Sequence, residues 1–196
     1  TKAELFKNAF PNRNLGTSNW ARCAKQRDEF MSRAKIEVYE KLYATAFAAT
    51  AKAAGEIAPE QRLHQPKDGK AHPLWLLGHL TFVPDAIVNS VVLGGEMSLP
   101  KQYRKRFAPG MIGGADISAD AAQYPAWDDI VEKYKQVTAN TFELLKRAQD
   151  SDLPGGMKGT TPPGFEEFFK SFEGTLGYML GHDSYHRGQM SLLANA

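Results

Sequence analysis

Three of the five histidines lie in two short apolar stretches of the sequence. His79 is part of "LLGHLTF" at 76–82, and His182 and His186 are part of "GHDSYHRGQM" at 181–190. Side chains four residues apart on a helix share a face, so two imidazoles can bind one ion at about 2 Å each. A third imidazole from a facing helix leaves at least one position open for water or substrate. Together the three histidines favour a metal site that can do chemistry.

The pair on its own is weak evidence, because this spacing arises easily by chance and each histidine could be a satisfied core or surface residue. His79, in the middle of an apolar helix, shifts the balance toward a metal. Burying three unpaired imidazoles is costly, and coordination would recover that cost. His64 and His72 fall in a loop and at a helix start, where solvated or capping histidines are common, so neither is placed in the site.

Helical phase places His182 and His186 on one face of the last expected helix. At 100° per residue, several apolar side chains fall within about 40° of His186; they include Phe168, Phe172, Met179, Met190 and Leu193. Both histidines are therefore expected to face the core. Asp183 and Gln189 lie roughly 60° to either side, near enough to hydrogen-bond an imidazole. His79 shares its side of the second helix with His72 and Trp75.

Four helices are expected to position these residues, because apolar positions recur at spacings of three and four. Their approximate ranges are 32–57, 73–93 with a kink at Pro84, 127–148, and 165 to the end. Residues 94–125 are rich in glycine and proline, with one short helical candidate at 100–107, and form a long connection. We predict an all-α fold, a four-helix bundle with this connection between its second and third helices.

Composition bounds the organisation and the setting of the chain. Residues 1–30 have a loop-like composition and are expected to be an extension, with the core fold at 31–196 beginning near Met31. A net charge of +2 offers no basic field for nucleic acid. The single cysteine, Cys23, fits a reducing cytoplasm. Pro84 and Asp85 interrupt the most apolar segment, so no membrane-spanning helix is expected.

The order of these motifs resembles the DinB-like superfamily of metalloenzymes. The resemblance covers about Met31 to the end, through "LLGHL", "LPKQYRKRFAPG", "YPAWDDIVEKY" and "HDSYHRGQ". It implies a bundle of DinB-like type, with His79, His182 and His186 as ligands of a divalent ion such as zinc, nickel or manganese. Relatives include bacillithiol-dependent thiol transferases, mycothiol-dependent maleylpyruvate isomerase and ergothioneine-forming sulfoxide synthases. The sulfoxide synthases carry an acidic residue where this chain has Gly188.

The resemblance implies a transferase or isomerase that acts with a low-molecular-weight thiol. The alternatives are a metal-binding stress-response protein without turnover, and a structural bundle whose histidines never meet. Trp75, Tyr103 and Arg104 are the candidate substrate contacts. Charge runs such as the one around Arg104 are commonly solvated, and Tyr103 could equally anchor the connection to the core.

A stripe of small residues runs along the last helix, opposite the histidines: Gly174, Gly177, Gly181, Ser184, Gly188 and Ser191. Glycine costs about 1 kcal/mol in a helix relative to alanine, so the stripe calls for an explanation. The second helix is also apolar on its back, through residues such as Leu74 and Val91. These faces predict a homodimer, or a cover formed by residues 1–30. Ordinary packing within the chain is the alternative.

Overall fold

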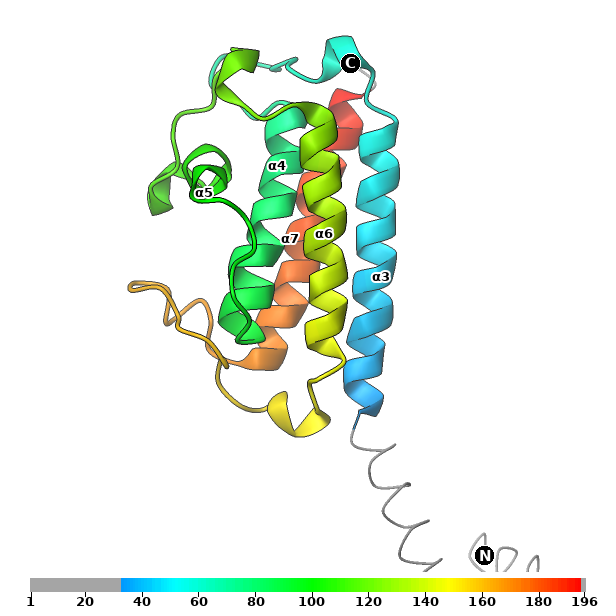
Figure 1. The fold of residues 1–196 in the computed structure, drawn as a ribbon, viewed down its shortest axis with the longest axis vertical. Coiled ribbons are helices and arrows are strands. Elements are labelled where there is room, and N and C mark those ends of the chain that lie inside the picture. Colours follow the sequence, from blue (N-terminus) through cyan, green and yellow to red (C-terminus); the bar gives the residue numbers. More distant parts are fainter. Residues whose placement is uncertain (1–32, 195–196) are drawn as a thin grey trace, which may run out of the picture.

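The computed structural model describes residues 33–194, and every regular element in that range is helical. The predicted extension at 1–30 lies outside the described residues. The long helices lie side by side in Figure 1: α3 (Ala34–Gly55), α4 (Pro73–Val83) continued by η2 (Pro84–Val92), α6 (Trp127–Leu145) and α7 (Phe172–Leu193). The shorter elements are η1 (Pro59–Gln61), α5 (Lys101–Phe107), η3 (Gly110–Ile112), η4 (Ala121–Gln123) and η5 (Asp150–Asp152). The all-α prediction is confirmed.

The directions of the helices explain the length of the chain between η2 and α6. Both α3 and α4 pack against α6 and α7. Helices α3 and α7 run in the same direction. In the first half of both helices, the Tyr43 hydroxyl donates to the Leu176 carbonyl. Beyond the end of both, the side-chain amide of Gln61 in η1 donates to the Ala194 carbonyl. Helices α4 and α6 both run downward in Figure 1. The chain must therefore return along the helices before α6 begins, which requires a long crossover.

The most apolar helix occupies the centre of the core, and all of α4 is buried. Pro84 has no N–H to donate, and there the helix passes into the wider π-helical turns of η2. Asp85, fully buried, accepts hydrogen bonds from the Ser98 and Leu99 backbone N–H groups at 2.9 Å and ties η2 to the following chain.

The expectation that Pro84 and Asp85 break this segment below membrane-spanning length is wrong. Helical structure continues through both residues, and Pro73–Val92 is long and apolar enough to span a membrane by length and composition. However, 83% of its apolar window is buried inside the protein, as in the core helix of a soluble protein. The back of this helix is covered within the chain as well, since Leu74 and Val91 are buried. Ordinary packing therefore accounts for that face.

Helix α7 begins at Phe172, seven residues later than the sequence pattern indicated. Ser171 caps it by accepting a hydrogen bond from the Gly174 N–H. The N–H of Phe172 donates to the Gly155 carbonyl at 3.0 Å, so the preceding loop fixes the start. Phe168, expected on the core face of this helix, is instead 60% exposed on a turn.

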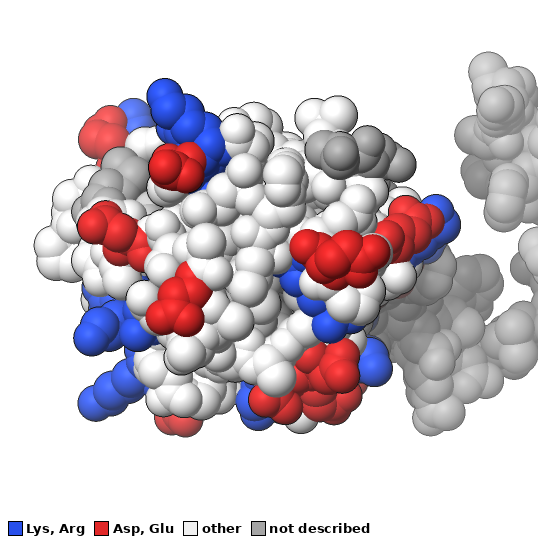
Figure 2. All heavy atoms as spheres, turned by 90° about the horizontal axis from the view of Figure 1, so that it is seen from above, with Lys and Arg blue, Asp and Glu red and all other residues white. Residues whose placement is uncertain are grey.

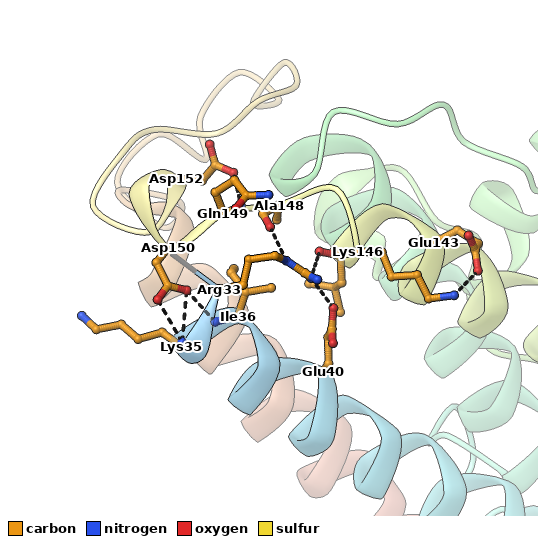
Figure 3. A network of polar contacts seen from close by, with 11 residues as sticks. Arg33, Lys35, Ile36, Glu40, Glu143, Lys146, Ala148, Gln149, Asp150 and Asp152 are labelled. Carbon is orange, nitrogen blue, oxygen red and sulfur yellow. Dashed lines mark hydrogen bonds and ion pairs between the residues drawn. The ribbon is translucent and has the colours of Figure 1, made fainter. Parts of the chain in front are cut away.

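A polar network joins the start of α3 to the end of α6 (Figure 3). The Arg33 guanidinium donates to the Leu145 carbonyl at the end of α6 and to the Ala148 carbonyl just beyond it. The same side chain pairs with Glu40 at 2.6 Å. The Asp150 carboxylate accepts from the first N–H groups of α3. These contacts fix the ends of the two helices against each other.

Charge is dispersed over the end of the molecule seen in Figure 2, where acidic and basic side chains alternate around a largely uncharged centre. This face offers no single-sign patch among the described residues. The view agrees with the small net charge of +2. The absence of a nucleic-acid partner stays a prediction.

Candidate metal site

The structure brings His79, His182 and His186 together between α4 and α7. One ligand atom from each imidazole lies within 4.8 Å of the other two. The ring centroids are 4.6 to 5.0 Å apart, and the Nε2 atoms of His79 and His182 are 3.1 Å apart. The alternative in which the histidines never meet is therefore wrong.

His79 is held firmly on the α4 side of the cluster and is only 2% exposed. Its Nδ1 lies 2.7 Å from the Phe107 carbonyl at the end of α5. A carbonyl only accepts, so Nδ1 carries the proton and the lone pair of Nε2 faces the other two rings. The Trp75 indole stacks on the His79 ring, with centroids 4.7 Å apart and planes 11° apart.

Gly78 makes this close approach possible. A Cβ atom at that position would lie 2.1 Å from the Phe107 ring, which is fully buried. The glycine in "LLGHL" was therefore a signal that another segment packs against the helix beside His79. The Phe107 carbonyl itself could not be found from the sequence, because every residue carries the same backbone group.

The α7 side of the cluster is more open, because His182 and His186 are only partly buried. The expectation that both face the closed core is thus only partly right. The Gln189 amide oxygen lies 2.7 Å from His186 Nδ1 and accepts a hydrogen bond from its N–H, which leaves the Nε2 lone pair free for a ligand. Tyr185, missed in the sequence, packs edge-on against His186 and is 65% exposed. It lies at the solvent side of the cluster.

The donor chemistry fits a metal ion. Burial lowers the pKa of His79 to about 3, helped by the two neighbouring imidazoles and opposed by the Phe107 carbonyl. Burial likewise lowers the pKa of His182 to about 4, and it lowers the pKa of His186. All three imidazoles are therefore neutral at pH 7, which is the form that binds metals.

Asp183 does not reach an imidazole. Its carboxylate accepts hydrogen bonds from the Thr50 hydroxyl at 3.0 Å and from the Arg187 guanidinium at 2.8 Å. Burial raises its pKa to about 6, although the Thr50 and Arg187 contacts act in the opposite direction. Asp183 therefore joins α7 to α3, while Gln189 is the predicted neighbour that contacts the cluster.

The three candidate substrate residues differ in their exposure, and only Arg104 is exposed. Trp75 contacts His79 but is only 6% exposed, so little of its surface is free for a substrate. Tyr103 is buried against Phe107, and burial raises its pKa to about 12. Arg104 is exposed on α5. Tyr103 is thus packed into the core, as expected if it anchors the long connection and does not contact a substrate.

His72, left out of the site, caps the first turn of α4. Its Nδ1 accepts from the Trp75 N–H, so Nε2 carries the proton that points to the Ser118 carbonyl at 2.9 Å. Burial lowers its pKa. The capping role considered for His72 is therefore present, and the ring also holds the connection against α4.

The small-residue stripe on α7 faces outward. Cβ atoms added at Gly177, Gly181 or Gly188 would meet no described neighbour within 4 Å. Tyr178 and Leu192, next to the stripe, are 52% and 75% exposed. Packing within the described chain does not explain this face, and the homodimer stays a prediction.

Comparison with known proteins identifies one family. The family model described as the DinB superfamily matches residues 42–190, which include all three histidines. No curated protein matches the chain.

Proposed function

The chain belongs to the DinB superfamily, and we propose that it is a divalent-metal-dependent enzyme whose ion is held by His79, His182 and His186. The observation that carries this proposal is the meeting of three neutral imidazoles from two helices within 4.8 Å of one another. Zinc and nickel suit imidazole donors, and manganese is the third candidate.

The reaction we propose is a transfer or isomerisation that uses a low-molecular-weight thiol. A bound ion would supply a positive charge that lowers the pKa of such a thiol, or of water. The chain supplies access from the α7 side, where His182 and His186 are partly exposed beside Tyr185. Arg104, exposed on α5, is the candidate contact for carboxylates of the thiol.

The second candidate is a metal-binding stress-response protein without turnover. It is favoured by the contacts of Asp183, the buried carboxylate next in sequence to His182. That group is engaged by Thr50 and Arg187 and so is not free to move protons at the cluster.

We also propose that residues 31–196 form a four-helix bundle of the DinB-like type, with the long connection between its second and third helices, and that the protein works in the cytoplasm. The packing of α3 and α4 on both α6 and α7 supports the bundle. A chain shortened to begin at Met31 should fold cooperatively. Failure to fold would show that residues 1–30 belong to the core.

Metal analysis of protein purified without an affinity tag tests the binding step. Wild-type protein should hold close to one ion per chain, and His182→Ala should hold little. His64→Ala is the matched control, because His64 is exposed on the loop before α4, and it should bind like wild type. Equal metal content in all three proteins would refute both candidate functions.

A conjugation assay separates the two candidates. Metal-loaded protein is mixed with bacillithiol, mycothiol or glutathione and an electrophile, and the loss of free thiol is followed. Turnover that disappears in His182→Ala supports the enzyme. Metal binding without turnover for any of these thiols favours the second candidate.

A further inference from the structure

One face of α4 is covered by the segment from Arg106 to Tyr124, here called the covering segment. Its contacts follow the helix in order. The Ser118 carbonyl meets His72 at the cap, and the Arg106 carbonyl accepts from the Trp75 indole N–H at 2.9 Å. One turn further on, the Phe107 carbonyl accepts from His79 Nδ1. Adjacent carbonyls of α5 therefore bind side chains four residues apart.

Trp75 makes two contacts that both bear on His79. Its ring lies parallel to the imidazole, with centroids 4.7 Å apart, and restricts rotation of the His79 side chain. Its N–H donates to the Arg106 carbonyl, one residue before the Phe107 carbonyl that accepts the hydrogen bond from His79 Nδ1–H. A shift of the end of α5 would move both carbonyls, because they belong to consecutive residues.

Arg106 is also held from the other side. Its guanidinium donates to the Gln123 side-chain oxygen at 3.0 Å, within the covering segment. The segment is packed as well as hydrogen-bonded, since the Phe107 ring stacks on Tyr124 with centroids 5.9 Å apart. Trp75 is the side chain that connects this assembly to the α4 face beside His79.

We propose that Trp75 is a positioning residue for His79: by holding the Arg106 carbonyl and stacking on the imidazole, it keeps the His79 Nδ1–H on the Phe107 carbonyl and Nε2 directed at the ion. The inference rests on the metal-binding part of the proposed function. Trp75 was expected from the sequence to contact a substrate; here it is proposed to orient a metal ligand. Groups that orient a ligating histidine affect metal affinity about 10- to 100-fold.

Trp75→Phe tests the proposal, because phenylalanine keeps an aromatic ring beside His79 but has no N–H to donate to the Arg106 carbonyl. It also loses the volume of one ring, and the control variant shares that loss. Trp127→Phe is the matched control, since Trp127 is buried on α6 against Arg62. We expect Trp75→Phe to bind Zn²⁺ about tenfold more weakly in a chelator competition. The visible absorption of bound Co²⁺ should also change. Trp127→Phe should match wild type in both measurements. A Trp75→Phe affinity within threefold of wild type, with an unchanged Co²⁺ spectrum, would overturn the proposal.

A second measurement needs no metal. The ¹⁵N shifts of the His79 ring at pH 7.5 report which nitrogen carries the proton. Wild type should show the proton on Nδ1, and Trp75→Phe should show a mixture of the two neutral forms. An unchanged His79 signal overturns the proposal even if wild type binds no ion, a result that would separately refute the metal-binding function. If Trp75→Phe does not fold, Gln123→Ala loosens Arg106 from the other side and should weaken Zn²⁺ binding several-fold in the same direction.

Discussion

His79 on α4 is 2% exposed and is held by a backbone carbonyl and a stacked indole. The pair on α7 is partly exposed, and His186 is held by the side chain of its own helix neighbour, Gln189. One side of the cluster is thus fixed by a distant segment, while the other is supported locally and open. A site of this kind has a rigid donor on its closed side and access for a ligand on its exposed side.

The closed side should be the most sensitive to added volume. Gly78→Ala should lower the free energy of unfolding by about 2–3 kcal/mol, because its Cβ would overlap the buried Phe107 ring. Urea denaturation measures the loss. The double variant Gly78→Ala, Phe107→Leu should recover part of it by making room. Strictly additive losses would mean that the two residues do not press on each other.

On the open side, the hydrogen bond from His186 to Gln189 should affect metal affinity more than the stability of the fold. Gln189→Leu removes the acceptor from His186 Nδ1 and should weaken Zn²⁺ binding about tenfold. Gln189→Glu keeps an acceptor and should bind at least as tightly as wild type. Isothermal titration calorimetry compares the three proteins. Equal affinities would show that His186 needs no partner to hold its orientation.

On the outer face of α7 an added side chain should stabilise the protein, in contrast to the closed side, where it would overlap a neighbour. Gly177→Ala should raise the free energy of unfolding by about 0.5–1 kcal/mol, because alanine is the better helix former and the site is open. Thermal unfolding at two protein concentrations measures the change. A loss of stability would mean that another chain packs on this face, as the predicted homodimer requires.

Acid should have the smallest effect on metal binding. Protons compete with an ion for imidazole only once the pH approaches the imidazole pKa, and burial lowers those of His79 and His182 to about 3 and about 4. His79 and His182 together should therefore change Zn²⁺ affinity less than about threefold between pH 7 and 5. Any larger loss would come from His186, whose pKa burial also lowers. If a histidine had an ordinary pKa near 6.5, Zn²⁺ affinity would fall about tenfold for each pH unit below that value. A steep loss centred near pH 6.5 would show that the donors are solvated.

The all-α fold and the approximate positions of the main helices could be predicted from the sequence, because the spacing of apolar residues indicates which face of a helix is buried. The predicted start of the last helix, at residue 165, was wrong, since α7 begins at Phe172. The loop carbonyl of Gly155 sets that boundary, and a contact between distant segments leaves no local pattern.

The site was partly predictable for the same reasons. Helical phase placed His182 beside His186 and Gln189 near them, since those relations lie within one helix. Asp183 was predicted at the same angle from His186 as Gln189, on the opposite side. Its contact with Thr50 depends on where α3 packs, which the sequence of α7 does not indicate. The hydrogen-bond acceptor of His79 is the Phe107 carbonyl, 28 positions away, and no side-chain pattern reports a backbone atom.

The four glycines of α7 have a consequence for motion. Each costs a helix about 1 kcal/mol relative to alanine, so α7 keeps its shape largely through contacts with its neighbours. Elements of this kind open first in local unfolding. Two of the three candidate ligands are carried by this helix, and an ion shared with His79 would cross-link it to α4. Amide hydrogen exchange in α7 should then slow on metal binding more than exchange in α3, and the occupancy of the site would set how often the last helix opens.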